Sequence, residues 1–127
     1  MRVLALRGAI TIDEDSADEI KARTMQLLDT LYRRNGLTHD DLISVFFTTT
    51  PDVTAAAPGV GARAFGLTEV PLLCAQEQDV QGALPRCVRL LAHLQLDRSR
   101  SELRHVFLRG ATDLRPELAE PGDKDLT

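Results

Sequence analysis

The chain lacks the patterns that mark several common classes of protein. Its 127 residues contain only two cysteines, Cys74 and Cys87, which form neither a C-x-x-C pair nor a disulfide framework, so we expect reduced thiols. No apolar run approaches the length of a membrane span, and the first residues become charged too soon for a signal peptide. We therefore expect a soluble, cytoplasmic protein.

An excess of positive charge is also missing. The 15 Lys and Arg residues are outnumbered by 19 Asp and Glu residues, which gives a net charge of −4. Such a chain has no global field that would attract nucleic acid or an anionic membrane, and we expect neither as a partner. Any anionic ligand must be bound by a local arrangement of cationic side chains.

Familiar catalytic and cofactor motifs do not occur. The three histidines, His39, His93 and His105, match no metal-ligand spacing, so we expect no metal. No nucleophile elbow marks a Ser–His–Asp group, and no Gly-rich loop resembles a phosphate cradle. The sequence therefore gives no support for nucleophilic hydrolysis or nucleotide chemistry, and we expect no cofactor.

Hydrophobic periodicity predicts four strands and two main helices. A capping box at Ser16–Glu19 opens the first helix, and Asn35-Gly36 ends it. The second main helix is expected over residues 83–94, with a buried face of Leu84, Cys87, Val88, Leu91 and Leu94. Short helices are expected at 38–41 and 61–65, and strands at 3–11, 42–50, 70–76 and 103–108.

This order of elements predicts an α+β fold with α/β-like layering. We expect helices packed on a mixed sheet of four to five strands. The length suits one domain, which we place at residues 1–116, followed by a polar C-terminal tail at 117–127 that we expect to be mobile.

Two arginines have unusual settings. Arg7 interrupts the most strand-like stretch of the chain, and Arg89 lies in the apolar run 84–91. Several guanidinium groups converging on one pocket would bind a small polyanionic ligand, because each can hold a carboxylate at two points. Each arginine also has an ordinary interpretation, as a strand end reaching solvent or a helix side chain whose charged end extends to water. The ordinary interpretations of the other candidates are a buried apolar thiol for Cys74 and surface charges for Arg63, Glu77 and Arg115.

The order and spacing of several short motifs are similar to those of one enzyme family. They are Leu6-Arg7-Gly8-Ala9, Thr50-Pro51-Asp52, Arg63, Val70-Pro71 with Cys74, Gln76-Glu77, Arg89, Arg104-His105-Val106 and Leu114-Arg115-Pro116. Over residues 7–116 the chain resembles the monofunctional chorismate mutases of the trimeric, mixed α/β class. The resemblance implies a homotrimer whose three sheets form a pseudo α/β barrel, with each active site between neighbouring subunits.

The resemblance also implies an activity and a set of site residues. The activity is the Claisen rearrangement of chorismate to prephenate in aromatic amino acid biosynthesis, which needs no cofactor. Arg89 would donate to the ether oxygen and Arg7 would bind a carboxylate, while Glu77 and Cys74 would meet the ring hydroxyl and the developing allyl charge. The remaining substrate-binding positions are Arg63 and Arg115 at the pocket mouth, Leu73 and Leu114 in its wall, and Phe107. The segment carrying Arg115 would be mobile until ligand binds.

Three positions depart from the family pattern. Phe107 replaces a common tyrosine, which predicts binding weaker by about 0.5–1.5 kcal/mol. Ala57 and Val60, possible pocket-wall residues, stand where an aromatic residue and a lysine are found. Two alternatives therefore stay open: an imine or enamine deaminase of similar trimeric fold, which would not need Arg89, and a non-catalytic metabolite-binding trimer.

Overall fold

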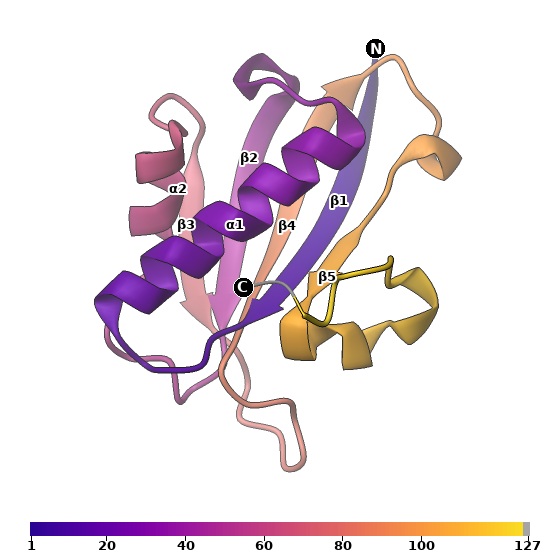
Figure 1. The fold of residues 1–127 in the computed structure, drawn as a ribbon. Helices are drawn as coiled ribbons and strands as arrows, with labels where there is room; N and C mark the ends of the chain where they lie inside the picture. Colours follow the sequence, from indigo (N-terminus) through magenta and orange to yellow (C-terminus); the bar gives the residue numbers. More distant parts are fainter. Residues whose placement is uncertain (126–127) are drawn as a thin grey trace.

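One mixed five-stranded sheet organises the protein, as the computed structural model of residues 1–125 shows (Figure 1). The elements are β1 (Arg2–Thr11), α1 (Ala17–Asn35), β2 (Leu42–Thr49), α2 (Gly59–Phe65), β3 (Leu72–Gln76), β4 (Cys87–Leu96) and β5 (Val106–Leu108), with 3-10 turns at His39–Asp41, Arg100–Glu102, Arg109–Leu114 and Pro116–Leu118. The strand order is β3-β2-β4-β1-β5. β4 runs antiparallel to both β1 and β2, whereas β5 and β3 are parallel to their neighbours. The α+β fold with a mixed sheet is confirmed.

The second main helix predicted over residues 83–94 is wrong. Cys87–Leu96 form β4, the central strand of the sheet, and residues 83–86 lie in the loop before it. Burial alternates from Val88 to Leu96, as expected for a strand. A short apolar run fits both helical and strand spacing, and here pairing with a strand on each side decides the outcome.

The first predicted helix is confirmed as α1, and local signals define both its ends. Ser16 accepts a hydrogen bond from the backbone N–H of Glu19 at 3.2 Å, which satisfies one donor of the first turn. Gly36 ends the helix in the left-handed conformation, with φ of 60°. Apolar side chains at helical spacing, including Ile20, Leu27 and Leu31, are buried against the sheet.

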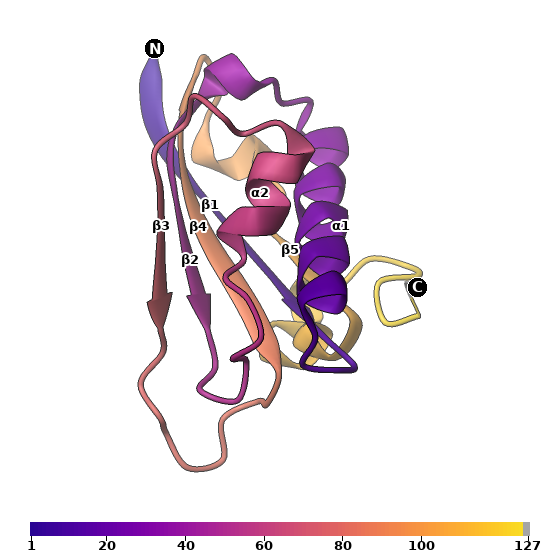
Figure 2. The same ribbon diagram turned by 90° about the vertical axis from the view of Figure 1, so that its left-hand side faces the viewer.

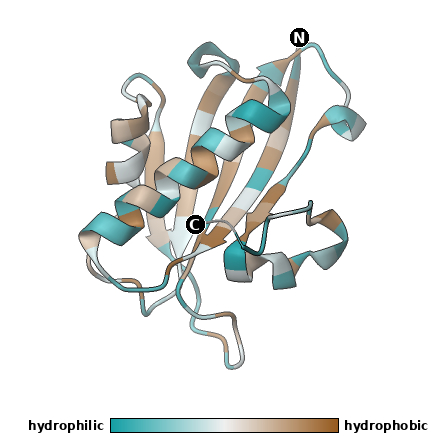
Figure 3. Ribbon diagram, viewed as in Figure 1, coloured by the Kyte–Doolittle hydropathy of each residue, from teal (hydrophilic) through white to brown (hydrophobic). Residues whose placement is uncertain are grey.

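Both helices cover the same face of the sheet (Figure 2). α2 packs closely on α1 because Gly61 has no side chain, since a Cβ there would lie 2.7 Å from Cβ of Thr24. The strands are apolar where α1 crosses them, while the outer surface of α1 is largely hydrophilic (Figure 3). The other face of the sheet has no helix over it within residues 1–125, and we call it the helix-free face.

The helix-free face exposes several large apolar side chains. These are Val3, Phe46, Leu73, which is 58% exposed, and Leu91. Strand alternation assigns them to this face, because Leu6 and Gly8 of β1 point toward α1, where a Cβ on Gly8 would lie 3.0 Å from Leu31. A single chain thus leaves an apolar sheet surface in water.

The chain returns to α1 after β5. The 3-10 turns of residues 109–118 lead to Glu120 and Asp123, and Asp123 contacts Arg34 near the end of α1. The division into a domain of residues 1–116 and a mobile tail of 117–127 stays a prediction, and residues 126–127 lie outside the described range. Among the described residues, no helix is long and apolar enough to cross a membrane.

Candidate active site

Arg7 and Arg89 lie close together on the helix-free face. The register pairs Arg7 with Leu91 and Ala9 with Arg89, so the two arginines are diagonal neighbours on adjacent strands. Both line one cavity of about 310 Å³, together with Phe46, Thr48, Leu90 and Leu91. Because Arg89 is on a strand and not on a helix, alternation along β4 decides that its side chain reaches this cavity.

Glu77 contacts two of the residues that line this cavity, Thr48 and Arg89. Its Oε2 lies 3.2 Å from Nε of Arg89, and both side chains are largely buried. The same Oε2 accepts a hydrogen bond of 2.7 Å from the hydroxyl of Thr48. The backbone N–H of Glu77 also donates to the carbonyl of Thr49 at 2.8 Å, which continues the pairing of β3 with β2 by one residue. Glu77 is therefore fixed through both its backbone and its carboxylate.

Arg89 carries a buried donor without a hydrogen bond. Its Nε is inaccessible to solvent and has no hydrogen-bond partner within residues 1–125, because the contact with Glu77 does not have the alignment of a hydrogen bond. Buried donors are nearly always satisfied in folded proteins, and each exception needs an explanation. Here the charge of the Glu77 carboxylate, whose Oε2 lies 3.2 Å away, offsets the missing hydrogen bond.

β5 supports Arg7 from the side of the buried core. The guanidinium carbon of Arg7 lies 5.7 Å from the centre of the Phe107 ring, within range of a cation–π contact. Phe107 is fully buried in a small cluster with Ala9, Cys87 and Ala111, against which Leu114 packs. Burial raises the pKa of Cys87 to about 11, so this thiol stays protonated.

His105 contacts the backbone of Arg7. The backbone N–H of Arg7 donates to Nδ1 of His105 at 2.9 Å. Burial, followed by the charges of Arg7 and Arg115, lowers the pKa of His105, which keeps Nδ1 available as an acceptor. Arg115 itself pairs with Glu117 at 2.5 Å and is half-exposed. The structure thus brings Arg7, Phe107, Leu114 and Arg115 to one end of the sheet.

Arg63 and Cys74 form a second group, apart from the first within one chain. Cys74 pairs with the buried Phe47 in the register of β2 and β3, so its side chain lies on the helix side of the sheet. A Cβ on Gly59 would lie 3.4 Å from Sγ of Cys74 and 3.5 Å from Nη1 of Arg63, which places these two side chains around the start of α2. The exposed Ala57 and Val60 flank the same region, and Leu73 points to the helix-free face.

Thr48 and His105 contact the site residues but were not predicted as part of the site. Thr48 stands opposite Arg89 in the register of β2 and β4, a relation that becomes visible only when β4 is recognised as a strand. His105 belongs to a motif that the sequence singled out, but its bond to the Arg7 backbone leaves no local signal. No three His, Cys, Asp or Glu side chains cluster as a metal site anywhere in residues 1–125.

A five-stranded sheet with both helices on one face, and with two arginines and a glutamate on the other, has close counterparts among known proteins. The family model for chorismate mutase type I matches residues 3–118. A solved chorismate mutase from Clostridium thermocellum superposes with a TM-score of 0.85 at 43% identity, covering 87% of this chain and 98% of that one. The chain belongs to the type I chorismate mutase family.

Two relatives by sequence carry the same name. Chorismate mutase AroH of Thermus thermophilus is 44% identical over 117 residues, which span 91% of this chain and 96% of the relative. Chorismate mutase AroH of Bacillus subtilis (strain 168) is 35% identical over 120 residues, or 94% of each chain. The similarity therefore extends over nearly the whole length of both proteins.

Proposed function

We propose that the protein is a chorismate mutase of aromatic amino acid biosynthesis and that it converts chorismate to prephenate in the cavity lined by Arg7 and Arg89. Family membership over residues 3–118 supports the activity. The observation that carries the choice of site is the convergence of two guanidinium groups, those of Arg7 and Arg89, on this one cavity, with Glu77 beside Arg89. The guanidinium of Arg89 lines the cavity and can donate to an oxygen of the substrate bound there.

The reaction needs the kind of group that this site offers. In the Claisen rearrangement an ether C–O bond breaks ahead of formation of the new C–C bond, so negative charge grows on the ether oxygen. A cationic donor at that oxygen binds the transition state more strongly than the substrate, which raises the rate. A preorganised donor of this kind is worth about 3–4 kcal/mol. No nucleophile and no proton transfer to the protein are required.

Arg7 and Glu77 have complementary parts in this proposal. Arg7 binds a carboxylate of the substrate and so favours the compact conformer in which the reacting carbons are close. Glu77 faces the ring, where it meets the hydroxyl group and the positive charge that develops on the allyl fragment. Its hydrogen bond from Thr48 and its ion pair with Arg89 hold the carboxylate in place.

The second group of residues motivates a homotrimer. Arg63 and Cys74 lie around β3 and α2, apart from the Arg7–Arg89 cavity of the same chain, whereas Leu73 lies on the helix-free face beside Phe46. A neighbouring subunit packed on the helix-free face would bring its own β3 and α2 to this cavity and cover the exposed apolar side chains. Three such contacts give the pseudo α/β barrel, with sites between subunits and with Arg115 and Leu114 at each mouth.

A cytoplasmic location goes with this proposal. Cys74 and Cys87 are both free thiols, the first exposed and the second buried. Unpaired thiols are typical of proteins that work in a reducing compartment.

The decisive experiment is a chorismate assay with the purified protein. We expect loss of chorismate absorbance matched by formation of prephenate at nanomolar to micromolar enzyme. A protein that binds a bicyclic transition-state mimic in a calorimeter but gives no turnover would be the non-catalytic trimer, which the replacements at Phe107 and Ala57 favour. Release of ammonia from an imine substrate without loss of chorismate would instead identify the deaminase alternative.

A further inference from the structure

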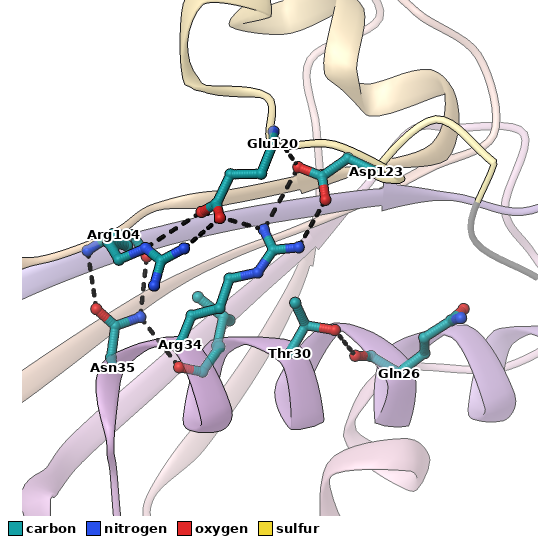
Figure 4. Close-up of polar contacts among 8 residues, drawn as sticks. Gln26, Thr30, Arg34, Asn35, Arg104, Glu120 and Asp123 are labelled. Carbon is teal, nitrogen blue, oxygen red and sulfur yellow. Dashed lines mark hydrogen bonds and ion pairs between the residues drawn. The ribbon is translucent and has the colours of Figure 1, made fainter.

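The C-terminal segment is fastened to α1 by an ion pair between Arg34 and Asp123 (Figure 4). Nη2 of Arg34 lies 2.6 Å from Oδ1 of Asp123, and Nη1 lies 3.4 Å from Oδ2. Glu120 adds a second carboxylate, with its Oε2 at 3.5 Å from Nη1 of Arg34. Glu120 also pairs with Arg104 ahead of β5, so the two acids of this segment are bound by arginines from two parts of the chain.

The ion pair between Arg34 and Asp123 is largely buried. The side chain of Asp123 is 1% exposed and that of Arg34 is 18% exposed. Both carboxylate oxygens of Asp123 have partners, since Oδ2 also accepts from the backbone N–H of Glu120 at 2.7 Å. Removing one member of a buried, fully partnered pair leaves a buried charge uncompensated, which costs far more than the loss of an exposed pair.

A backbone hydrogen bond links the ion pair of Arg34 and Asp123 to the segment that carries Arg115. The carbonyl of Asp123 accepts a bond of 2.7 Å from the N–H of Arg109, the first residue of the 3-10 turn that follows β5. That turn ends at Leu114, which packs beside Phe107, and Arg115 comes next. Residues 109–123 thus form a closed loop. The carbonyl of Asp123 bonds the first residue of the loop, Arg109, and the carboxylate of Asp123 binds Arg34 of α1.

The two anchoring acids lie beyond the part of the chain that matches the family model, which ends at residue 118. The resemblance implies a C-terminal segment that becomes ordered when ligand binds. In this chain the segment has its own anchor on α1, the buried ion pair of Asp123 with Arg34. When a segment is already ordered in the free protein, the entropy cost of ordering it does not weaken the free energy of substrate binding.

We propose, on the basis of the proposed function, that Arg34 and Asp123 are positioning residues that hold residues 109–123 in place and thereby keep Arg115 at the pocket mouth before substrate binds. Their effect is on binding and is transmitted by Arg115. Neither residue touches the substrate.

The test compares Asp123→Asn with the wild-type protein. We expect KM for chorismate to rise roughly threefold to tenfold, the cost of immobilising one or two side chains on binding, while kcat changes less than twofold. Hydrogen exchange of residues 109–123 should become faster in the free protein. The matched control is Asp29→Asn, which removes the exposed pair of Asp29 with Arg33 on the same helix and should leave both readouts unchanged.

A double-mutant cycle separates positioning from general destabilisation. Asp123→Asn should raise KM in the wild-type background but add little to the effect of Arg115→Gln, since both act through the same group. An equal rise in both backgrounds, or unchanged exchange of residues 109–123, would overturn the proposal. If Asp123→Asn does not fold, Glu120→Gln weakens the same anchor at a more exposed position. A wild-type protein without activity would refute the proposed function, and the exchange measurement would still decide whether the anchor exists.

Discussion

Thr48 and Arg89 face each other across β2 and β4 and reach the same atom, Oε2 of Glu77, at 2.7 and 3.2 Å. The hydroxyl of Thr48 donates a hydrogen bond to this oxygen, whereas the guanidinium of Arg89 forms an ion pair with it, so two partners of different kinds hold the carboxylate in position. This arrangement makes Glu77 a fixed charge of the site. Because the two partners differ in charge, replacing Arg89 and replacing Thr48 should have different effects on activity.

Replacing Arg89 by glutamine should act mainly on turnover. We expect kcat to fall about a hundred- to thousandfold, equivalent to the roughly 3–4 kcal/mol of one preorganised donor, with a smaller change in KM. Steady-state kinetics with chorismate measure both constants. Arg33→Gln, which changes an exposed arginine of α1, is the matched control. A large rise in KM with unchanged kcat would mean that Arg89 binds substrate and transition state equally.

Thr48→Val should weaken the site without abolishing it. The valine keeps the shape of the side chain but removes the hydroxyl that bonds Glu77. The loss of one such bond is worth about 0.5–1.5 kcal/mol, so kcat/KM should fall roughly twofold to tenfold. Thr48→Ser retains the hydroxyl and should stay close to wild type. Equal losses in both variants would show that packing, and not the bond to Glu77, is what Thr48 supplies.

Gly61→Ala should destabilise the contact between α1 and α2. The new Cβ would lie 2.7 Å from Cβ of Thr24 and 2.9 Å from the carbonyl oxygen of Lys21, and a backbone oxygen cannot move away easily. Overpacking costs about 1–3 kcal/mol, which outweighs the gain of up to about 1 kcal/mol in helix propensity. The free energy of unfolding in urea should fall accordingly. Ala64→Ser, at an exposed position of the same helix, should change it by less than about 0.5 kcal/mol.

The stability of the protein should depend on pH through His105. Its pKa in the folded state is lowered from 6.5 by burial and by the charges of Arg7 and Arg115. As the pH falls from 6.5 to this lower value, the unfolded chain binds a proton that the folded chain does not, so the free energy of unfolding decreases. His105→Gln should show a smaller decrease over that range in urea titrations at several pH values. Parallel curves for both proteins would contradict this role.

The sequence predicts α1 well because its signals are local. The cap at Ser16, the amphipathic spacing and the left-handed Gly36 lie within or next to the helix itself. β4 was misread because its apolar residues fit two periodicities, and its strand character comes from β1 and β2, which lie far away in the sequence. Tertiary context decided this element against its local pattern.

The residues of the candidate site also differ in whether the sequence could indicate them. The resemblance points to Arg7, Glu77 and Arg89, and the sheet register explains how Arg7 and Arg89 reach one cavity and how Glu77 comes to lie beside Arg89. Thr48 was missed because its place beside Arg89 depends on the strand that was misread. The partnership of Arg34 and Asp123 spans 89 residues, and in a chain with many charges of both signs such a pair has no distinguishing pattern.

The position of β4 at the centre of the sheet also bears on how the protein is made. β1 and β2 both pair with β4, which comes later in the chain. The two earlier strands therefore cannot take their places in the sheet until residues 87–96 have been synthesised. During synthesis on the ribosome, α1 can form early, but the central pairings cannot begin until the chain has emerged as far as Cys87 and cannot be completed before Leu96. Closing such long loops slows folding. Nascent chains that end before Leu96 therefore present unpaired apolar strands, which are natural targets for chaperones.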